Sequence, residues 1–244
     1  MKPAKKHVLL AVAALAIVAL GFGGFSLIKA QQERAEYAKF RPLPTGPVGD
    51  GIEAIRDDFV NMYVLRDGNH LALIDAGVSA ESVGRELRQA NIDPAAVEHI
   101  FLTHAHYDHI GALVLFKNAR IHIARPELAK LGDKEKAGFP VAPTPFDDGE
   151  HLQLGNSTIQ ALIVPGHTPG STAYLFNGKT LFTGDTLALE NDHVTPFNER
   201  FNLDTALQRE SLSKLARLQG ITRIATAHYG TSTDYSTAFK GWAP

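Results

Sequence analysis

The sequence contains no cysteine among its 244 residues. Disulfide bonds, thiolate metal ligands and a cysteine nucleophile are therefore excluded. The chain also has no excess of positive charge, because 24 Lys and Arg residues stand against 26 Asp and Glu residues. Proteins that bind nucleic acids usually carry a basic surface, so the charge balance argues against a nucleic-acid partner. With 44% hydrophobic and 20% charged residues, the composition is that of a globular protein.

Charged residues are missing from residues 8–28. At 1.5 Å per residue, an apolar helix of this length covers about 30 Å, the thickness of a bilayer core. We therefore predict a transmembrane anchor at residues 8–28. Lysines in the preceding residues 1–7 favour a cytoplasmic amino terminus, which would place the rest of the chain outside the cytoplasm, in the periplasm or beyond. A signal peptide cleaved after Ala30, which would give a secreted protein, is the alternative.

A polar, proline-containing stretch follows, so residues 29–50 are predicted to be a linker and residues 51–244 a globular domain. Ser79 and Asp204 are expected to cap helices at residues 80–90 and 205–218, and a third helix is expected at residues 110–116. In the last helix, Leu207, Leu212, Leu215 and Leu218 are expected to face inward. Strands are expected at residues 59–66, 70–75, 99–103, 120–124, 158–164, 172–177, 179–183 and 222–227, with a hairpin turn at Asp67-Gly68-Asn69. This mixture predicts a layered α/β fold.

The chain has 11 histidines, and their densest cluster follows the strand expected at residues 99–103. It reads His104-Ala105-His106-Tyr107-Asp108-His109. Residues two apart in extended backbone point to the same side, so His104 and His106 can bind one cation together. Asp108 and His109 lie where the chain turns toward the next helix, where they are placed for a second cation. Imidazole and carboxylate ligands suit zinc, iron or manganese.

Three further polar residues directly follow expected strands. They are His167 in Pro165-Gly166-His167-Thr168, Asp185 in Thr183-Gly184-Asp185, and His228 in Thr226-Ala227-His228. Taken singly, each has a simpler explanation as a turn or cap residue. Strand ends gather at one edge of an α/β sheet, so we expect the three residues to join the histidine cluster.

The order of these motifs, H-x-H-x-D-H followed by His, Asp and His, resembles the metallo-β-lactamase superfamily of metal hydrolases over about residues 52–230. The resemblance implies a four-layer αββα sandwich with a two-metal site between its sheets. It implies one metal held by His104, His106 and His167, a second held by Asp108, His109 and His228, and Asp185 as the bridge between them. It also implies that Asp75, at a strand end, orients a ligand histidine. A turn-capping role is the alternative for Asp75.

The resemblance implies a hydrolase with two zinc ions per chain, with iron or manganese as alternatives. Such a pair of cations shares a water and lowers its pKa, so that a bridging hydroxide can attack the substrate. The candidate catalytic residues are Asp108, to orient the nucleophile, His228, beside the second metal, and Tyr229, to donate a hydrogen bond to an oxyanion. We expect the substrate to be an ester, thioester or lactone of a small molecule.

Several residues of this sequence differ from those of individual branches of the superfamily, and the differences indicate which branch it resembles. Asp185 argues against a β-lactamase, because those enzymes generally carry Cys or Ser near that position. The chain looks like a bacterial glyoxalase-II-like subgroup, although it reads Thr186-Leu187-Ala188-Leu189 where glyoxalase II has Gly-Cys-Gly-Arg. A one-iron persulfide dioxygenase of the same fold is the alternative enzyme, and an anchored, non-catalytic metal-binding module is the alternative to an enzyme. His193 and Arg200 are candidate substrate contacts, with solvated loop residues as the competing interpretation. The sequence leaves the oligomeric state open.

Overall fold

The computed structural model describes residue 31 and residues 34–242. The chain divides into two compact units, Met1–Phe40 and Arg41–Pro244. The described part of the first unit contains a helical turn at residues 34–37. The predicted cytoplasmic segment, residues 1–7, and the predicted transmembrane helix, residues 8–28, lie outside the described residues and stay predictions from the sequence. Among the helices that are described, none combines the length and the apolar character needed to cross a bilayer.

The first sheet of the second unit has seven strands in the order of the chain. They are β1 (Gly46–Gly49), β2 (Ile52–Asp57), β3 (Val60–Asp67), β4 (His70–Ile74), β5 (Val97–Phe101), β6 (Arg120–Ala124) and β7 (Thr144–Phe146). Strands β1 to β4 pair antiparallel, and β4 to β7 pair parallel. The predicted hairpin is present, since Asp67 at the end of β3 lies opposite His70 at the start of β4. Strand β1 lies within the stretch expected to be a linker.

The second sheet has six strands in the order β15-β14-β11-β10-β9-β8. They are β8 (His151–Leu154), β9 (Ser157–Ile163), β10 (Thr172–Phe176), β11 (Thr180–Phe182), β14 (Arg223–Ala225) and β15 (Thr231–Ser232). Strands β11 and β14 pair parallel, while the other neighbours pair antiparallel. A separate hairpin is formed by β12 (Leu187–Glu190) and β13 (His193–Pro196). Both sheets therefore mix parallel and antiparallel pairs.

The helices of this unit are α2 (Ala80–Gln89), α3 (Tyr107–Ile110), α4 (Arg125–Lys130), α5 (Asp133–Lys136), α6 (Thr205–Leu215) and α7 (Tyr235–Ala238). Short 3-10 turns occur at Pro94–Ala96 and Leu113–Leu115. Ser79 caps α2 as predicted, since its side chain accepts from the Ser82 backbone N–H. Asp204 caps α6 in the same way through the Leu207 N–H. Helix α6 ends at Leu215, three residues before the predicted end.

The helix predicted at residues 110–116 is wrong. Helix α3 ends at Ile110, and a separate 3-10 turn follows at Leu113–Leu115. The reason is a close approach of backbones, because a Cβ at Gly111 would lie 1.9 Å from the Val78 carbonyl oxygen. Instead of continuing a helix, the Gly111 N–H donates to the carbonyl of Gly77. A tertiary contact therefore divides the segment.

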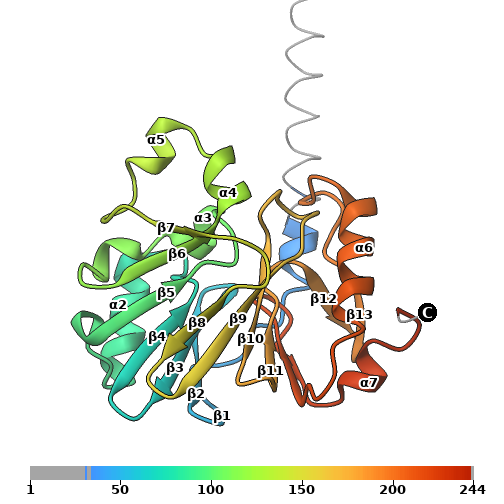
Figure 1. The fold of residues 1–244 in the computed structure, drawn as a ribbon, viewed down its shortest axis with the longest axis horizontal. Coiled ribbons are helices and arrows are strands. Elements are labelled where there is room, and N and C mark those ends of the chain that lie inside the picture. The colour runs from blue at the N-terminus through green and yellow to red at the C-terminus, as the bar shows by residue number, and fades with distance from the viewer. Residues whose placement is uncertain (1–30, 32–33, 243–244) are drawn as a thin grey trace, which may run out of the picture. The chain divides into compact units, whose positions relative to one another are not determined.

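Three apolar clusters separate the four layers of the unit. Strand β3 shows how the layers are built, because Met62 and Val64 pack toward α2 while Tyr63 and Leu65 pack between the sheets. On the far side of the second sheet, Leu212 of α6 packs in the third cluster. Figure 1 shows α2 outside the first sheet and α6 outside the second. This arrangement confirms the αββα sandwich.

The loops that carry the candidate ligands leave the ends of four strands. The loop after β5 carries His104, the loop after β9 carries His167, the loop after β11 carries Asp185, and the loop after β14 carries His228. Strand β5 belongs to the first sheet, and the other three strands belong to the second. Both sheets therefore contribute side chains to one site.

Candidate metal centre

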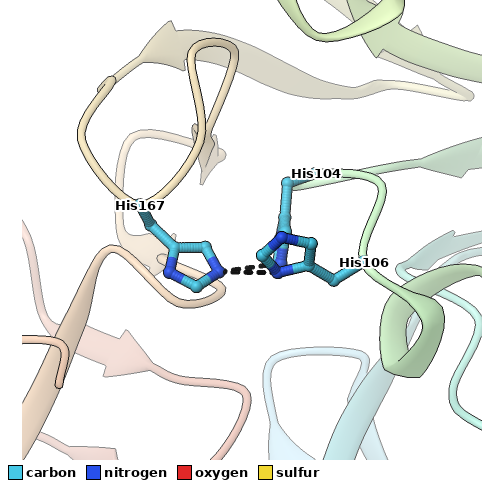
Figure 2. A group of neighbouring side chains, drawn as sticks. All are labelled: His104, His106 and His167. Atoms are coloured by element: carbon cyan, nitrogen blue, oxygen red, sulfur yellow. Dashed lines mark hydrogen bonds between the residues drawn. The ribbon is translucent and has the colours of Figure 1, made fainter. Parts of the chain in front are cut away.

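Three imidazoles form the first group of candidate ligands, and Figure 2 shows them turned toward one another. His167 Nε2 lies 3.2 Å from His104 Nε2 and 2.9 Å from His106 Nδ1. Burial lowers the pKa of all three rings, that of His167 to about 4, so they are neutral at pH 7. Ring nitrogens at this separation repel each other unless a proton or a metal ion lies between them. The first group therefore has the form of a cation site.

Two carboxylates and two imidazoles form the second group, Asp108, His109, Asp185 and His228. Asp108 Oδ2 lies 3.6 Å from His109 Nε2 and 3.4 Å from His228 Nε2. Asp185 Oδ1 lies 3.4 Å from His109 Nε2 and 3.1 Å from His228 Nε2. All four side chains are buried. The candidate ligand atoms within each of the two groups lie within 4.8 Å of one another.

Asp185 faces both groups. Its Oδ1 points toward the second group, whereas its Oδ2 lies 3.4 Å from His167 Nε2 and 4.0 Å from His104 Nε2. One carboxylate therefore stands between the two groups with an oxygen for each. This is the position expected of a residue that bridges two metals.

The carboxylates of the second group favour positive charge at its centre. Burial by itself would lower the pKa of His109, but the carboxylates of Asp75, Asp108 and Asp185 raise it well above its ordinary value. Burial also opposes the charged form of His228, yet Asp185 and Asp108 raise the pKa of His228 to about 9. In turn, against the effect of burial, His228 and His109 hold the pKa of Asp185 well below its usual range. Negative potential is thus concentrated at this group.

Hydrogen bonds from the second ring nitrogen fix which nitrogen of His228, His109 and His167 can bind a metal. His228 Nδ1 donates to the carbonyl oxygen of Phe59 at 2.8 Å, and His109 Nδ1 donates to Asp75 Oδ2 at 2.8 Å. His167 Nδ1 lies 3.2 Å from Asn202 Oδ1. A ring that donates from Nδ1 keeps Nε2 as a lone pair, which is the form that binds metals. In each case Nε2 is the atom that faces the candidate centre.

Asp75 occupies the position that the sequence predicted for it, at the end of β4. Its backbone has a φ of 62°, a conformation that Asp adopts more readily than most residues. Asp75 Oδ1 accepts from the Thr103 backbone N–H at 2.8 Å, and Asp75 Oδ2 accepts from the Thr103 hydroxyl at 2.8 Å. Asp75 therefore ties the β5 strand end to His109.

An amide pair behind His167 and Asp185 was missed by the sequence analysis. The buried Gln208 of α6 donates from Nε2 to Asn202 Oδ1 at 3.1 Å and to the backbone carbonyl of Asp185 at 3.2 Å. A Cβ at Gly166 would lie 2.4 Å from the Cα of Gln208, so only glycine fits this approach. The glycine before His167 was the only trace of this contact in the sequence.

The donor atoms fit two divalent cations. Among the described residues, His109 Nε2 and Asp185 Oδ1 are buried side-chain atoms that make no hydrogen bond. A buried polar atom without a partner is costly, and a cation placed between these atoms would satisfy both. Imidazole nitrogens and carboxylate oxygens are also ligands that zinc and iron accept. The individual ligand assignments remain predictions, with all seven side chains brought to one place.

The remaining candidate residues lie at different distances from this centre. The Tyr229 ring packs edge-on against the Phe197 ring, with 6.1 Å between the ring centroids. The Phe197 and His228 ring centroids are 5.7 Å apart. The role predicted for its hydroxyl stays a prediction. His193 Nδ1 lies 3.2 Å from the carbonyl oxygen of Thr237, next to α7 rather than beside the metal ligands. Arg200 is exposed.

Comparisons with known proteins agree with this geometry. Residues 55–228 match the family model described as the metallo-beta-lactamase superfamily. A hydroxyacylglutathione hydrolase of Photobacterium profundum is 32% identical over 187 residues, which cover 77% of this chain and 68% of that protein. A probable metallo-hydrolase of Bacillus subtilis is 30% identical over 166 residues, 61% of this chain and 71% of that protein.

The fold also matches solved structures. A metallo-beta-lactamase family protein from Thermus thermophilus superposes with a TM-score of 0.64 at 22% identity, covering 80% of this chain and 78% of that one. BJP-1, a subclass B3 metallo-beta-lactamase of Bradyrhizobium japonicum, superposes with a TM-score of 0.60 at 21% identity, covering 78% and 79%. At these identities the likeness shows the fold.

Proposed function

The chain belongs to the metallo-beta-lactamase superfamily and is a metal-dependent hydrolase. We propose that it binds two zinc ions and uses them to cleave the thioester bond of a small molecule. The observation that carries the two-metal part is Asp185, which offers one oxygen to each group of ligands. The thioester part is supported by the relatives named hydroxyacylglutathione hydrolase, of which the Photobacterium protein is 32% identical.

The contacts within each group support the ligand assignment. His104, His106 and His167 would hold one cation, Asp108, His109 and His228 would hold the other, and Asp185 would be shared. Two divalent cations bound there would supply a nucleophile from water at neutral pH and would offset the negative charge that develops on the carbonyl oxygen. The carbonyl of Phe59 and the side chains of Asp75 and Asn202 keep His228, His109 and His167 in the tautomer that binds metal through Nε2.

Asp108 and Tyr229 are assigned the remaining roles. The contacts of Asp108 to His109 and His228 run through Oδ2, so we assign Oδ1 to orient the attacking water. Tyr229 follows His228 directly, and its ring packs against Phe197 beside the ligand rings. We assign its hydroxyl to donate to the carbonyl oxygen as that atom gains charge.

The test begins with the purified full chain and measures zinc, iron and manganese per chain. The same sample is then assayed on a hydroxyacyl thioester of glutathione, the matching oxygen ester and a lactone. We expect two zinc ions per chain and turnover of the thioester above the other two substrates. One iron per chain with oxygen consumption on a persulfide and no hydrolysis would contradict the proposal and identify a dioxygenase.

The variant Asp185→Asn tests the shared ligand. We expect it to lower kcat/KM on the thioester by on the order of 100-fold and to reduce the metal content, because Asn offers one neutral oxygen where Asp offers two charged ones. Asp148→Asn is the matched control, since Asp148 is exposed and pairs with Lys214 at 2.8 Å. Full activity and full metal content in Asp185→Asn would overturn the assignment.

A further inference from the structure

One buried carboxylate near the centre has no place in the ligand set. Glu127 lies in α4 and has an exposed fraction of 0%. In the described part of the chain, no Lys, Arg or His forms an ion pair with it. A buried carboxylate is costly without compensating bonds, so its partners matter. Its two oxygens accept from two backbone N–H groups, those of Ala105 and Gly170, each at 3.1 Å.

These two N–H groups belong to the two loops that carry the first ligand group. Ala105 stands between His104 and His106, and Gly170 lies three residues after His167. The loops leave strands of different sheets, and beside them a backbone hydrogen bond from the Thr172 N–H to the Thr103 carbonyl oxygen, at 2.9 Å, joins the two segments. Glu127 Oε1 contacts one loop and Glu127 Oε2 contacts the other. One buried side chain therefore contacts both parts of a three-histidine site, closer along the chain to the ligands than the backbone bond between Thr172 and Thr103.

The approach of α4 to the second loop is unusually close. A Cβ at Gly170 would lie 2.3 Å from the backbone nitrogen of Glu127, so any larger residue would push the loop away. Glycine at this position lets the Gly170 N–H reach the carboxylate. The separation between His167 and the other two histidines is thus set partly by this contact.

We propose that Glu127 is a positioning residue for the first metal, holding His104 and His106 at the correct distance from His167. The inference rests on the proposed function for the presence of that metal. Both carboxylate oxygens of Glu127 are acceptors, so the side chain accepts from both loops at once. A glutamine in its place has one acceptor oxygen, and its NH2 group would face one of the backbone N–H groups.

The experiment compares metal release from the full-length wild-type chain and from Glu127→Gln. Both proteins are loaded with two zinc ions and exposed to a zinc chelator, and the release of each ion is followed over time. We expect one of the two ions to leave about 10- to 100-fold faster from Glu127→Gln, with the other unchanged. Cobalt-loaded samples identify the affected site, with His167→Ala and His228→Ala as references for loss of the first and second metal.

Asp67→Asn is the matched control. Like Glu127, Asp67 accepts hydrogen bonds from backbone N–H groups of a separate segment, among them that of Ser157 at 2.8 Å. Asp67 lies at the turn between β3 and β4. We expect both metals to leave this variant at the wild-type rate. Unfolding of the metal-free proteins in urea measures how much each substitution lowers the stability of the fold. A general loss of stability would not by itself speed the release of one ion and leave the other unchanged.

Each outcome decides the proposal. Equal acceleration of both ions, acceleration of the second ion alone, or wild-type release from Glu127→Gln would overturn it. So would the same selective loss in Asp67→Asn. A wild-type chain that binds no pair of metals would instead contradict the proposed function, and that result is read before any variant is compared.

Discussion

Replacing Asp75 by Asn changes the charge of the centre while leaving its shape nearly intact. Asn is similar in size to Asp and tolerates the positive φ of 62° at this position. The substitution therefore alters the hydrogen bonds and little else. In the native protein, Asp75 Oδ1 accepts from the Thr103 N–H and Asp75 Oδ2 accepts from His109 Nδ1, both at 2.8 Å.

An amide cannot serve both of these donors. If the NH2 group of the introduced amide lies beside His109, it donates to Nδ1, and the ring proton moves to Nε2, the atom that faces Asp108 and Asp185. A protonated Nε2 cannot bind a metal. If the NH2 group lies on the other side, it faces the Thr103 N–H and loosens the strand end. Loss of such a supporting residue typically weakens metal binding by 10- to 100-fold, or about 1.4 to 2.7 kcal/mol.

The affinity for zinc is measured by competition with a chelator, and the tautomer of His109 by nitrogen-15 NMR of the imidazole rings. We expect the second metal of Asp75→Asn to bind about 10- to 100-fold more weakly, with the neutral form of the His109 ring carrying its proton on Nε2 instead of Nδ1. Asp57→Asn is the control, because Asp57 is equally buried and accepts from the backbone N–H groups of Val78 and Ser79. Wild-type affinity for both metals in Asp75→Asn would refute the reasoning.

Two further predictions concern stability. Burial, with smaller effects of His99 and Arg120, lowers the pKa of His122 to about 4, so the unfolded chain takes up a proton below about pH 6.5 that the folded chain does not. The contribution of His122 to the free energy of unfolding is therefore complete above that pH and is lost by up to about 3 kcal/mol toward pH 4. Because the other buried histidines are the same in both proteins, urea unfolding should show a smaller fall between about pH 6.5 and about pH 4 in His122→Asn than in the wild type. A fall of equal size in both proteins would contradict this. Leu212→Ala should lower the free energy of unfolding by about 2 to 5 kcal/mol, because Leu212 is fully buried. Leu207→Ala should lower it by less than about 0.5 kcal/mol, because Leu207 is 37% exposed. Similar losses in the two variants would exclude the orientation assigned to helix α6.

The features that could be predicted from the sequence are those that depend on neighbouring residues. Ser79 and Asp204 cap helices because a side-chain oxygen two or three residues away reaches the free N–H groups. The spacing of His104 and His106 and the strand-end positions of His167, Asp185 and His228 were likewise visible as local patterns. They carry most of the candidate site.

The features that were missed depend on contacts between distant segments. Helix α6 illustrates this, since Leu207 was expected to face inward but is 37% exposed. The helix instead buries Gln208, whose amide reaches Asn202 and the carbonyl of Asp185, and this polar contact is invisible to a hydrophobic pattern. Glu127 was missed for the same reason, because its two partners lie 22 and 43 residues away. Strands of two to four residues, such as β12, β13 and β15, are too short to show an alternating pattern.

Because the candidate ligands come from both sheets, a bound metal would also affect the stability of the fold. His106 and His167 are 61 residues apart, and a metal held by both closes that length of chain into a loop. In the chain-entropy account of cross-links, closing a loop of this size restricts the unfolded state by about 4 kcal/mol, as a disulfide would. With the proposed metals bound, a chain without cysteine would gain a cross-link that forms and breaks with metal supply rather than with redox potential. A shortage of the metal would then lower the stability of the fold and abolish the activity together.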